Sequence, residues 1–179
     1  MPTSYPITGI VYDTDGSTLM TSGTCKLYDV TTGESILTNI ASDGSFSIDL
    51  ANLTSYSNED KLQVVLYDST KTKSTEFRHT VNTGLSGYDA GSLYMHWTVP
   101  ILGDSTLMGL VISNKSDSAE YTVDFYDRKY DNKLLSCDVN VNSSFSPTLW
   151  FKGIYFEGGI CVIRESDAAN TVEVQMVVK

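Results

Sequence analysis

Aspartates beside glycine turns are the residues whose type and spacing come closest to metal chemistry. Asp13 and Asp15 precede Gly16, and Asp127 is followed by Asp131. A calcium ion takes about six to eight oxygen ligands, and a carboxylate farther along the chain normally completes its shell. The DxDG segment lacks the next ligand position and the downstream Glu of an EF-hand loop. We therefore predict hairpin turns at both places and no metal site.

The two histidines do not belong to a recognisable catalytic motif. His79 lies in the strand-like segment FRHTV and His96 stands beside Trp97, and neither has a Ser, Cys or Asp at a motif-like spacing. The sequence contains no GxSxG, no HExxH and no glycine-rich phosphate loop. Aspartates at strand ends facing water do not have the surroundings that separate the pKa values of an acid/base pair. We predict that the chain is not an enzyme and uses no cofactor.

The three cysteines do not form a disulfide framework by number or spacing. They stand at positions 25, 137 and 161, without a CxxC pair. An odd and scattered set favours buried free thiols on strands, which suit a reducing compartment. The alternative is a bond between Cys137 and Cys161, which requires their strands to be neighbours.

A Tyr-Asp dipeptide recurs near the ends of the expected strands. A tyrosine can lay its ring on the sheet edge with its hydroxyl in water, while the following Asp accepts N–H groups of a turn. A row of aromatic rings for carbohydrate or for a protein partner is the functional alternative. The pairs begin at Tyr12, Tyr28, Tyr67, Tyr88, Tyr126 and Tyr130.

Alternation of apolar and polar residues predicts β-strands along most of the chain. Residues 46–50 and 62–66 are the clearest cases, with Phe46, Leu62 and their alternate neighbours directed at a core. About seven strands are expected before Pro100, the last two over 75–81 and 91–97. Residues 50–60 are expected to form a short helical turn or a connection between sheets, because the segment is too short and polar for a packed helix.

Residues 7–50 contain three apolar bursts, each closed by an Asp/Gly turn: ITGIVYDTDGST, GTCKLYDVTTGESILTNI and SDGSFSIDL. This segment resembles the opening of transthyretin-like or carboxypeptidase-regulatory-like (Ig-like) seven-stranded sandwich modules. The resemblance implies an accessory, spacer or display role of the kind such modules have in secreted proteins and phage particles.

The second half repeats the strand pattern after the segment VPILGDS at 99–105. Expected strands cover 107–113, 121–126, 134–141, 146–151, 159–164 and 171–178. An "ISN" strand end, a tyrosine-ended strand, a Ser/Thr-rich strand before a Leu/Trp edge and a Gly-Gly turn resemble modules of tailed-bacteriophage virion proteins. We predict an all-β chain of two tandem antiparallel β-sandwich domains: 1–100, Ig-like/transthyretin-like, and 101–179, a jelly-roll-like sandwich or barrel for assembly contacts. The short linker predicts close coupling of the two.

Charge and hydropathy exclude several partners. The chain carries 22 acidic and 12 basic side chains, for a formal net charge of -10. Because phosphate binding needs clustered Lys and Arg, nucleic acid and anionic membrane are not expected partners. The N-terminus MPTSYPITG shows no signal-peptide pattern and no apolar run approaches membrane-span length, so assembly in a host cytoplasm is expected.

Large apolar side chains gather in the run LWFKGIYF at 149–156, in excess of what one half-exposed strand needs. Such a surplus indicates a contact surface. The expected protein-interface residues are Trp150, Phe151, Tyr155 and Phe156, with Trp97 near the interdomain joint.

These features favour a bacteriophage virion structural protein, a capsid decoration or accessory head, neck or tail subunit. It would form homo-oligomers and bind other virion proteins such as the major capsid protein. A bacterial surface or secreted adhesin-like module for glycan or protein is the alternative. A third class is the accessory domain of a carbohydrate-active or peptidase enzyme.

Overall fold

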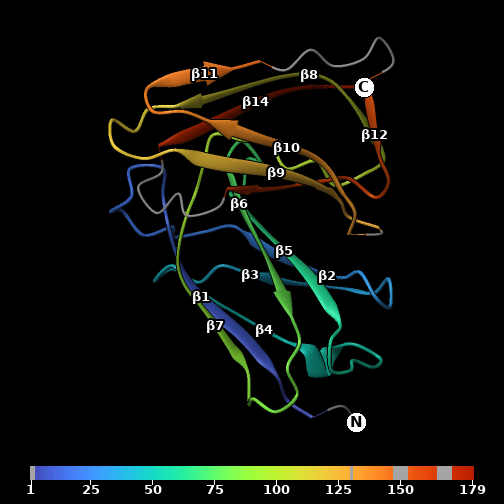
Figure 1. The fold of residues 1–179 in the computed structure, drawn as a ribbon. Coiled ribbons are helices and arrows are strands. Elements are labelled where there is room, and N and C mark those ends of the chain that lie inside the picture. The colour runs from blue at the N-terminus through green and yellow to red at the C-terminus, as the bar shows by residue number, and fades with distance from the viewer. Residues whose placement is uncertain (1–2, 130, 147–152, 165–170) are drawn as a thin grey trace.

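The computed structural model describes residues 3–129, 131–146, 153–164 and 171–179 of the chain. These residues form fourteen strands and a single 3₁₀ turn, so the prediction of an all-β fold is confirmed (Figure 1). Figure 1 shows the strands of the second half stacked on those of the first, with β8, β11 and β14 farthest from the N-terminus.

The first half folds into two facing sheets. Sheet A has the order β4-β1-β7 and sheet B the order β3-β2-β5-β6. All neighbours are antiparallel except β1 and β7, which are parallel. The elements are β1 (Pro6–Tyr12), β2 (Thr24–Asp29), β3 (Ser35–Asn39), β4 (Ser45–Asp49), the 3₁₀ turn η1 (Leu50–Asn52), β5 (Lys61–Tyr67), β6 (Ser74–Thr80) and β7 (Tyr88–Tyr94).

Seven strands and a short helical turn after residue 50 agree with the sequence-based expectation, whereas the last strand is displaced. It spans Tyr88–Tyr94 rather than 91–97. The chain then crosses to the other sheet, where His96 and Ser74 exchange backbone hydrogen bonds at 3.0 Å. The apolar pattern at 91–97 therefore runs through two sheets and does not belong to one strand.

The second half forms two further sheets. Sheet C has the order β10-β9-β13, and in sheet D the strand β8 has β14 on one side and both β11 and β12 on the other. Ser146 lies outside any strand, and residues 147–151 of the strand expected over 146–151 lie outside the described residues. The strands are β8 (Ser105–Asn114), β9 (Tyr121–Asp127), β10 (Lys133–Val139), β11 (Ser143–Phe145), β12 (Ile154–Phe156), β13 (Ile160–Arg164) and β14 (Val172–Val178).

Buried apolar side chains gather in two separate clusters, one in each half. The first lies between sheets A and B and includes Ile7, Leu27 and Phe46. The second lies between sheets C and D and includes Phe125 and Phe156. The alternation along each strand explains both, because every second side chain of β1, β2 and β4 is buried.

Four buried apolar residues belong to neither cluster, and they lie where the halves meet. They are Val65, Tyr67, Tyr126 and Cys161. Strand β5 is buried along its whole length after Lys61, because one face covers the first core and the other faces the second sandwich. The outer faces of sheets B and C thus form a joint between the two sandwiches.

The three cysteines are buried and free, as the preferred interpretation predicted. Cys137 and Cys161 lie on β10 and β13, which flank β9 on opposite sides, so they are not neighbours. Cys137 faces the second core and Cys161 faces the joint. Burial raises the pKa of the Cys25 thiol to about 12 and that of the Cys137 thiol to about 11.

Candidate functional site

A buried ion pair crosses the joint between the sandwiches. Arg128 Nη2 donates to Glu76 Oε2 at 2.7 Å, and the two side chains are 1% and 3% exposed. The guanidinium also donates to the carbonyls of Ile101 and Ile160 at 3.2 and 2.9 Å. Val162 N donates to the same Glu76 oxygen at 3.3 Å. Separating the sandwiches would leave each buried charge without its partner, so this pair opposes relative motion of the two halves.

A second polar group of the joint is centred on Asp131. Arg78 Nε donates to Asp131 Oδ1 at 2.9 Å, and its guanidinium carbon lies 4.0 Å from the ring centroid of Tyr126. Gln63 Nε2 donates to the same carboxylate at 2.8 Å and to Asp127 O at 3.0 Å. Asp131 therefore bonds to the first sandwich. The hairpin turn predicted around Asp127 is present, since Asp127 N donates to Asn132 O at 3.1 Å.

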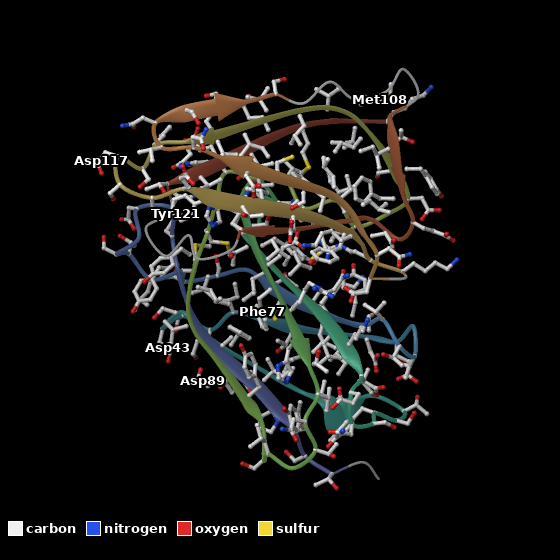
Figure 2. The ribbon with its side chains drawn as sticks, in the orientation of Figure 1. Asp43, Phe77, Asp89, Met108, Asp117 and Tyr121 are labelled. Atoms are coloured by element: carbon white, nitrogen blue, oxygen red, sulfur yellow. The ribbon has the colours of Figure 1, made fainter. Side chains whose placement is uncertain are left out.

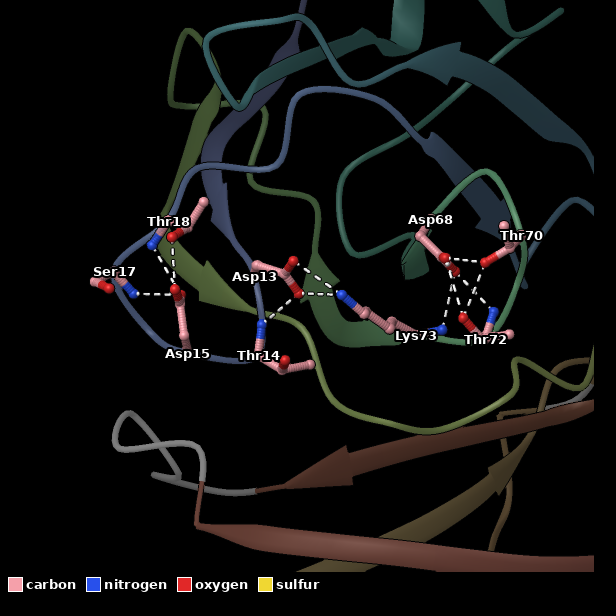
Figure 3. A network of polar contacts seen from close by, with 9 residues as sticks. All are labelled: Asp13, Thr14, Asp15, Ser17, Thr18, Asp68, Thr70, Thr72 and Lys73. Carbon is pink, nitrogen blue, oxygen red and sulfur yellow. Dashed lines mark hydrogen bonds and ion pairs between the residues drawn. The ribbon is translucent and has the colours of Figure 1, made fainter.

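Trp97 lies on the surface of the first sandwich beyond the end of β7, with its ring mostly exposed. Lys73 Nζ is 4.6 Å from the ring centroid and bonds to both carboxylate oxygens of Asp13, at 2.6 and 2.9 Å (Figure 3). Burial raises the pKa of Asp13, but the hydrogen bonds from Lys73 and Thr14 together with the charge of Lys73 outweigh it and hold that pKa below its usual value. Trp97 is thus an accessible ring held beside a cation.

The Asp15 carboxylate closes its own turn. It accepts the backbone N–H groups of Ser17 and Thr18 at 2.9 and 2.8 Å and the Thr18 hydroxyl (Figure 3). The Thr18 hydroxyl and the two N–H groups lower the pKa of Asp15 to about 2. The hairpin turn predicted here is confirmed, because Asp13 N donates to Thr18 O at 2.7 Å and Tyr12 forms an antiparallel bridge with Leu19.

The Tyr-Asp pairs also serve turns at three of their six positions. Their carboxylates accept N–H groups one to five residues farther along the chain. The turn interpretation is confirmed for Asp13, Asp29 and Asp68. Asp89 accepts the N–H of Gly91 at 2.9 Å, but both residues lie inside strand β7, so this pair does not mark a turn.

The outer face of sheet D carries a group of exposed apolar side chains. Met108 and Val111 project from β8, Val177 projects from β14 opposite Gly109, and Tyr155 projects from β12 beside Thr106. These four apolar side chains are called the distal face below. Figure 2 shows Met108 at the opposite end of the molecule from Asp43 and Asp89. Large exposed apolar patches on soluble proteins are common at protein–protein contact surfaces.

Tyr155 is the one residue of the run LWFKGIYF that the structure places on the distal face. Partial desolvation and a hydrogen bond with Asp104 raise the pKa of its phenol. Phe156 is fully buried in the second core, so its predicted role as a surface anchor is wrong. The reason is the alternation of β12, which turns Phe156 inward when Tyr155 faces out. Trp150 and Phe151 lie outside the described residues.

Sequence reasoning missed the other members of the distal face. Their signal is the segment LMGLVIS of β8, in which apolar residues occupy both faces of the strand, and the segment MVV of β14, in which the same is true. One face of each strand fills the second core. The surplus on the other face is what remains exposed.

The two histidines lie at different places in the first sandwich. His79 Nε2 lies 3.0 Å from the Tyr5 hydroxyl, and its ring stacks on Tyr88 with 3.9 Å between centroids. Burial lowers the pKa of His79, which favours a neutral ring packed among aromatics. His96 belongs to the backbone bridge with Ser74.

No group of three or more His, Cys, Asp or Glu side chains with metal-binding geometry occurs among the described residues. The described part of the chain also has no helix long and apolar enough to span a membrane. Comparison with known proteins identified no matching protein family and no matching curated protein.

Proposed function

We propose that this chain is a bacteriophage virion structural protein, a capsid decoration or other accessory subunit that acts through protein–protein contacts. The observation that carries the proposal is the distal face, four exposed apolar side chains on the sheet farthest from the first sandwich. Its partners would be other virion proteins such as the major capsid protein, and its location the particle assembled in the host cytoplasm.

The joint supports the proposal because an assembly subunit benefits from a fixed shape. The Arg128–Glu76 pair and the group around Asp131 connect the sandwiches through buried, directional contacts. A rigid body loses little conformational entropy when its distal face docks, so less of the contact energy is spent on ordering. The first sandwich would then project from the particle.

The test is a binding assay on particles that lack this chain. Val111→Glu places a charge in the middle of the distal face, at a residue that is 38% exposed. Ile10→Glu is the matched control, because Ile10 is a β-branched residue in a strand of sheet A and is 42% exposed. We expect wild type and Ile10→Glu to bind particles and Val111→Glu to lose most of its binding. Absence of the chain from purified virions by mass spectrometry would contradict the proposal.

A glycan-binding module is the second candidate, and one cleft favours it. The outer face of sheet A bounds a cavity of about 720 Å³ lined mainly by small polar side chains, among them Thr8, Ser45, Ser47, Asn39 and Asp89. Hydroxyl, amide and carboxylate groups can exchange hydrogen bonds with sugar hydroxyls. A glycan array with wild type and Asp89→Ala would test this candidate: binding by wild type that the variant lacks would support it.

A further inference from the structure

Strand β14 forms an edge of sheet D that is long and poor in charge. Its seven residues, VEVQMVV, contain one charged side chain, Glu173. Within the part of the chain that the structure describes, β14 pairs with β8 alone. A long apolar edge strand presents a row of backbone N–H and C=O groups to which a further strand can add.

The other edge strands of equal length have features that discourage such pairing. Strand β10 carries Lys133 and Asp138, and charges on an edge oppose addition of a strand. Strand β7 is interrupted by Gly91 at a φ of +68°, outside the extended conformation. Strand β6 carries Glu76 and Arg78, both engaged in the joint. Among these seven-residue edges, β14 is the most suited to bind a strand.

Hydrogen bonds to the neighbouring strand fix the direction of the backbone groups of β14. Thr171 O accepts from Lys115 N, and Lys179 and Thr106 exchange both backbone bonds, all at 2.9 to 3.0 Å. Backbone groups alternate in direction along an antiparallel strand. The odd-numbered residues of β14 therefore bond toward β8.

The even-numbered residues Val174, Met176 and Val178 consequently direct their N–H and C=O groups at the open edge. The register shift at Val177 does not disturb this alternation, because the extra residue, Met108, lies on β8. The outer part of β14 is also accessible, since Val177 is 65% exposed and Val178 is exposed as well.

We propose that β14 pairs antiparallel with β14 of a second copy of this chain, about a two-fold axis at Met176. This register places Met176 opposite itself, Val174 opposite Val178 and Glu173 opposite Lys179. Such a contact is isologous, with each copy using the same surface. It rests on the proposed function and deepens it, because it supplies the self-association of an assembly subunit.

Charge complementarity selects the register. With the axis at Met176, the Glu173 carboxylate of each copy meets the Lys179 ammonium of the other, next to the ion pair that Glu173 already forms with Lys115. An axis at Gln175 would instead put Glu173 opposite Val177 and Lys179 opposite a threonine. Opposite charges on facing positions stabilise an antiparallel pair. The axis at Met176 is therefore favoured.

Cysteine cross-linking tests the register directly. In the proposed dimer Gln175 faces Val177 of the other copy as a non-hydrogen-bonded pair, with a Cα separation of about 4.5 Å, which a disulfide can span. The double variant Gln175→Cys/Val177→Cys should form a covalent dimer under mild oxidation. Gln175→Cys alone should not, and a covalent dimer of this single variant would overturn the register. The native thiols do not interfere, since all three are buried.

Light scattering after size exclusion tests the dimer itself. We expect wild type to be a dimer, and Lys179→Glu to weaken it about tenfold because two symmetric contacts turn from attractive to repulsive. Val178→Pro should weaken it too, because it removes an N–H that points at the open edge. Lys71→Glu, an exposed change on the first sandwich, is the control and should leave the dimer intact.

Circular dichroism of each variant verifies that the fold is retained. A wild-type protein that is monomeric at a concentration of about 100 μM would overturn the inference. A dimer that does not bind particles would contradict the proposed function and leave the inference standing. A monomer that binds particles would contradict the inference and leave the proposed function standing.

Discussion

Substitution of Arg128 by Met removes one partner of the buried ion pair at the joint. The Glu76 carboxylate, 3% exposed, loses its cationic partner and keeps the long bond from Val162 N and the contact with the Cys161 thiol, and the carbonyls of Ile101 and Ile160 lose a donor. Breaking a buried pair by removing one partner costs about 3–5 kcal/mol. A native domain is stable by about 5–15 kcal/mol in total, so the loss is a large share of it.

Urea unfolding followed by tryptophan fluorescence measures this effect. With a slope of about 2 kcal/mol per molar urea, the midpoint of Arg128→Met should fall by about 2 M. Glu76→Gln should destabilise the protein similarly, because it leaves the Arg128 charge buried and unpaired. The double variant should lose less than the sum of the two by about 1–3 kcal/mol, since neither charge remains.

The matched control is Lys129→Met, next in the chain. The ion pair of Lys129 with Glu157 is exposed, and exposed pairs are worth about 0–1 kcal/mol. If Arg128→Met shifted the free energy of unfolding no more than Lys129→Met, or if the two single effects at the joint were additive, the reasoning about the buried pair would be refuted.

Three further predictions concern thiols, acid and a glycine. The three buried cysteines should react with a thiol reagent at pH 8 only after unfolding, because burial raises their pKa values; rapid labelling of native protein would count against the burial of these thiols in the two cores and the joint. Since the folded pKa of Asp15 is about 2, below its usual value, its stabilising effect is complete above about pH 4 and is lost as the pH falls toward 2. Thermal unfolding at pH 6 and 2.5 should therefore differ less for Asp15→Asn than for wild type, and equal differences would contradict this. Gly159→Ala should lower stability by about 1–3 kcal/mol in urea unfolding, because φ is +113° and a Cβ would lie 2.3 Å from Ile101 O. Gly16→Ala, at a φ of +72° with open space around it, should cost about 1 kcal/mol, and an equal loss at both glycines would show that the close approach at Gly159 is unimportant.

Local sequence determined the strands and turns because their signals are short-ranged. Alternation in residues 46–50 and 62–66 marked β4 and β5, and Asp15 and Asp68 bond within their own turns, where neighbouring residues suffice. Tyr155 was identified as a surface aromatic from the apolar run around it. The inward position of Phe156 depends on the register of β12 with β8, which the run of aromatics does not specify.

Only the tertiary structure decided which apolar strand faces are covered. Strands β5 and β8 both carry apolar side chains on their two faces, so their sequences look alike. Val65 of β5 is fully buried because the second sandwich packs on it, whereas Val111 of β8 remains exposed. The sequence by itself therefore determined an all-β chain with more apolar strand surface than two cores can hold. Packing between residues far apart in the chain assigned part of that surplus to the joint and left the rest on the distal face.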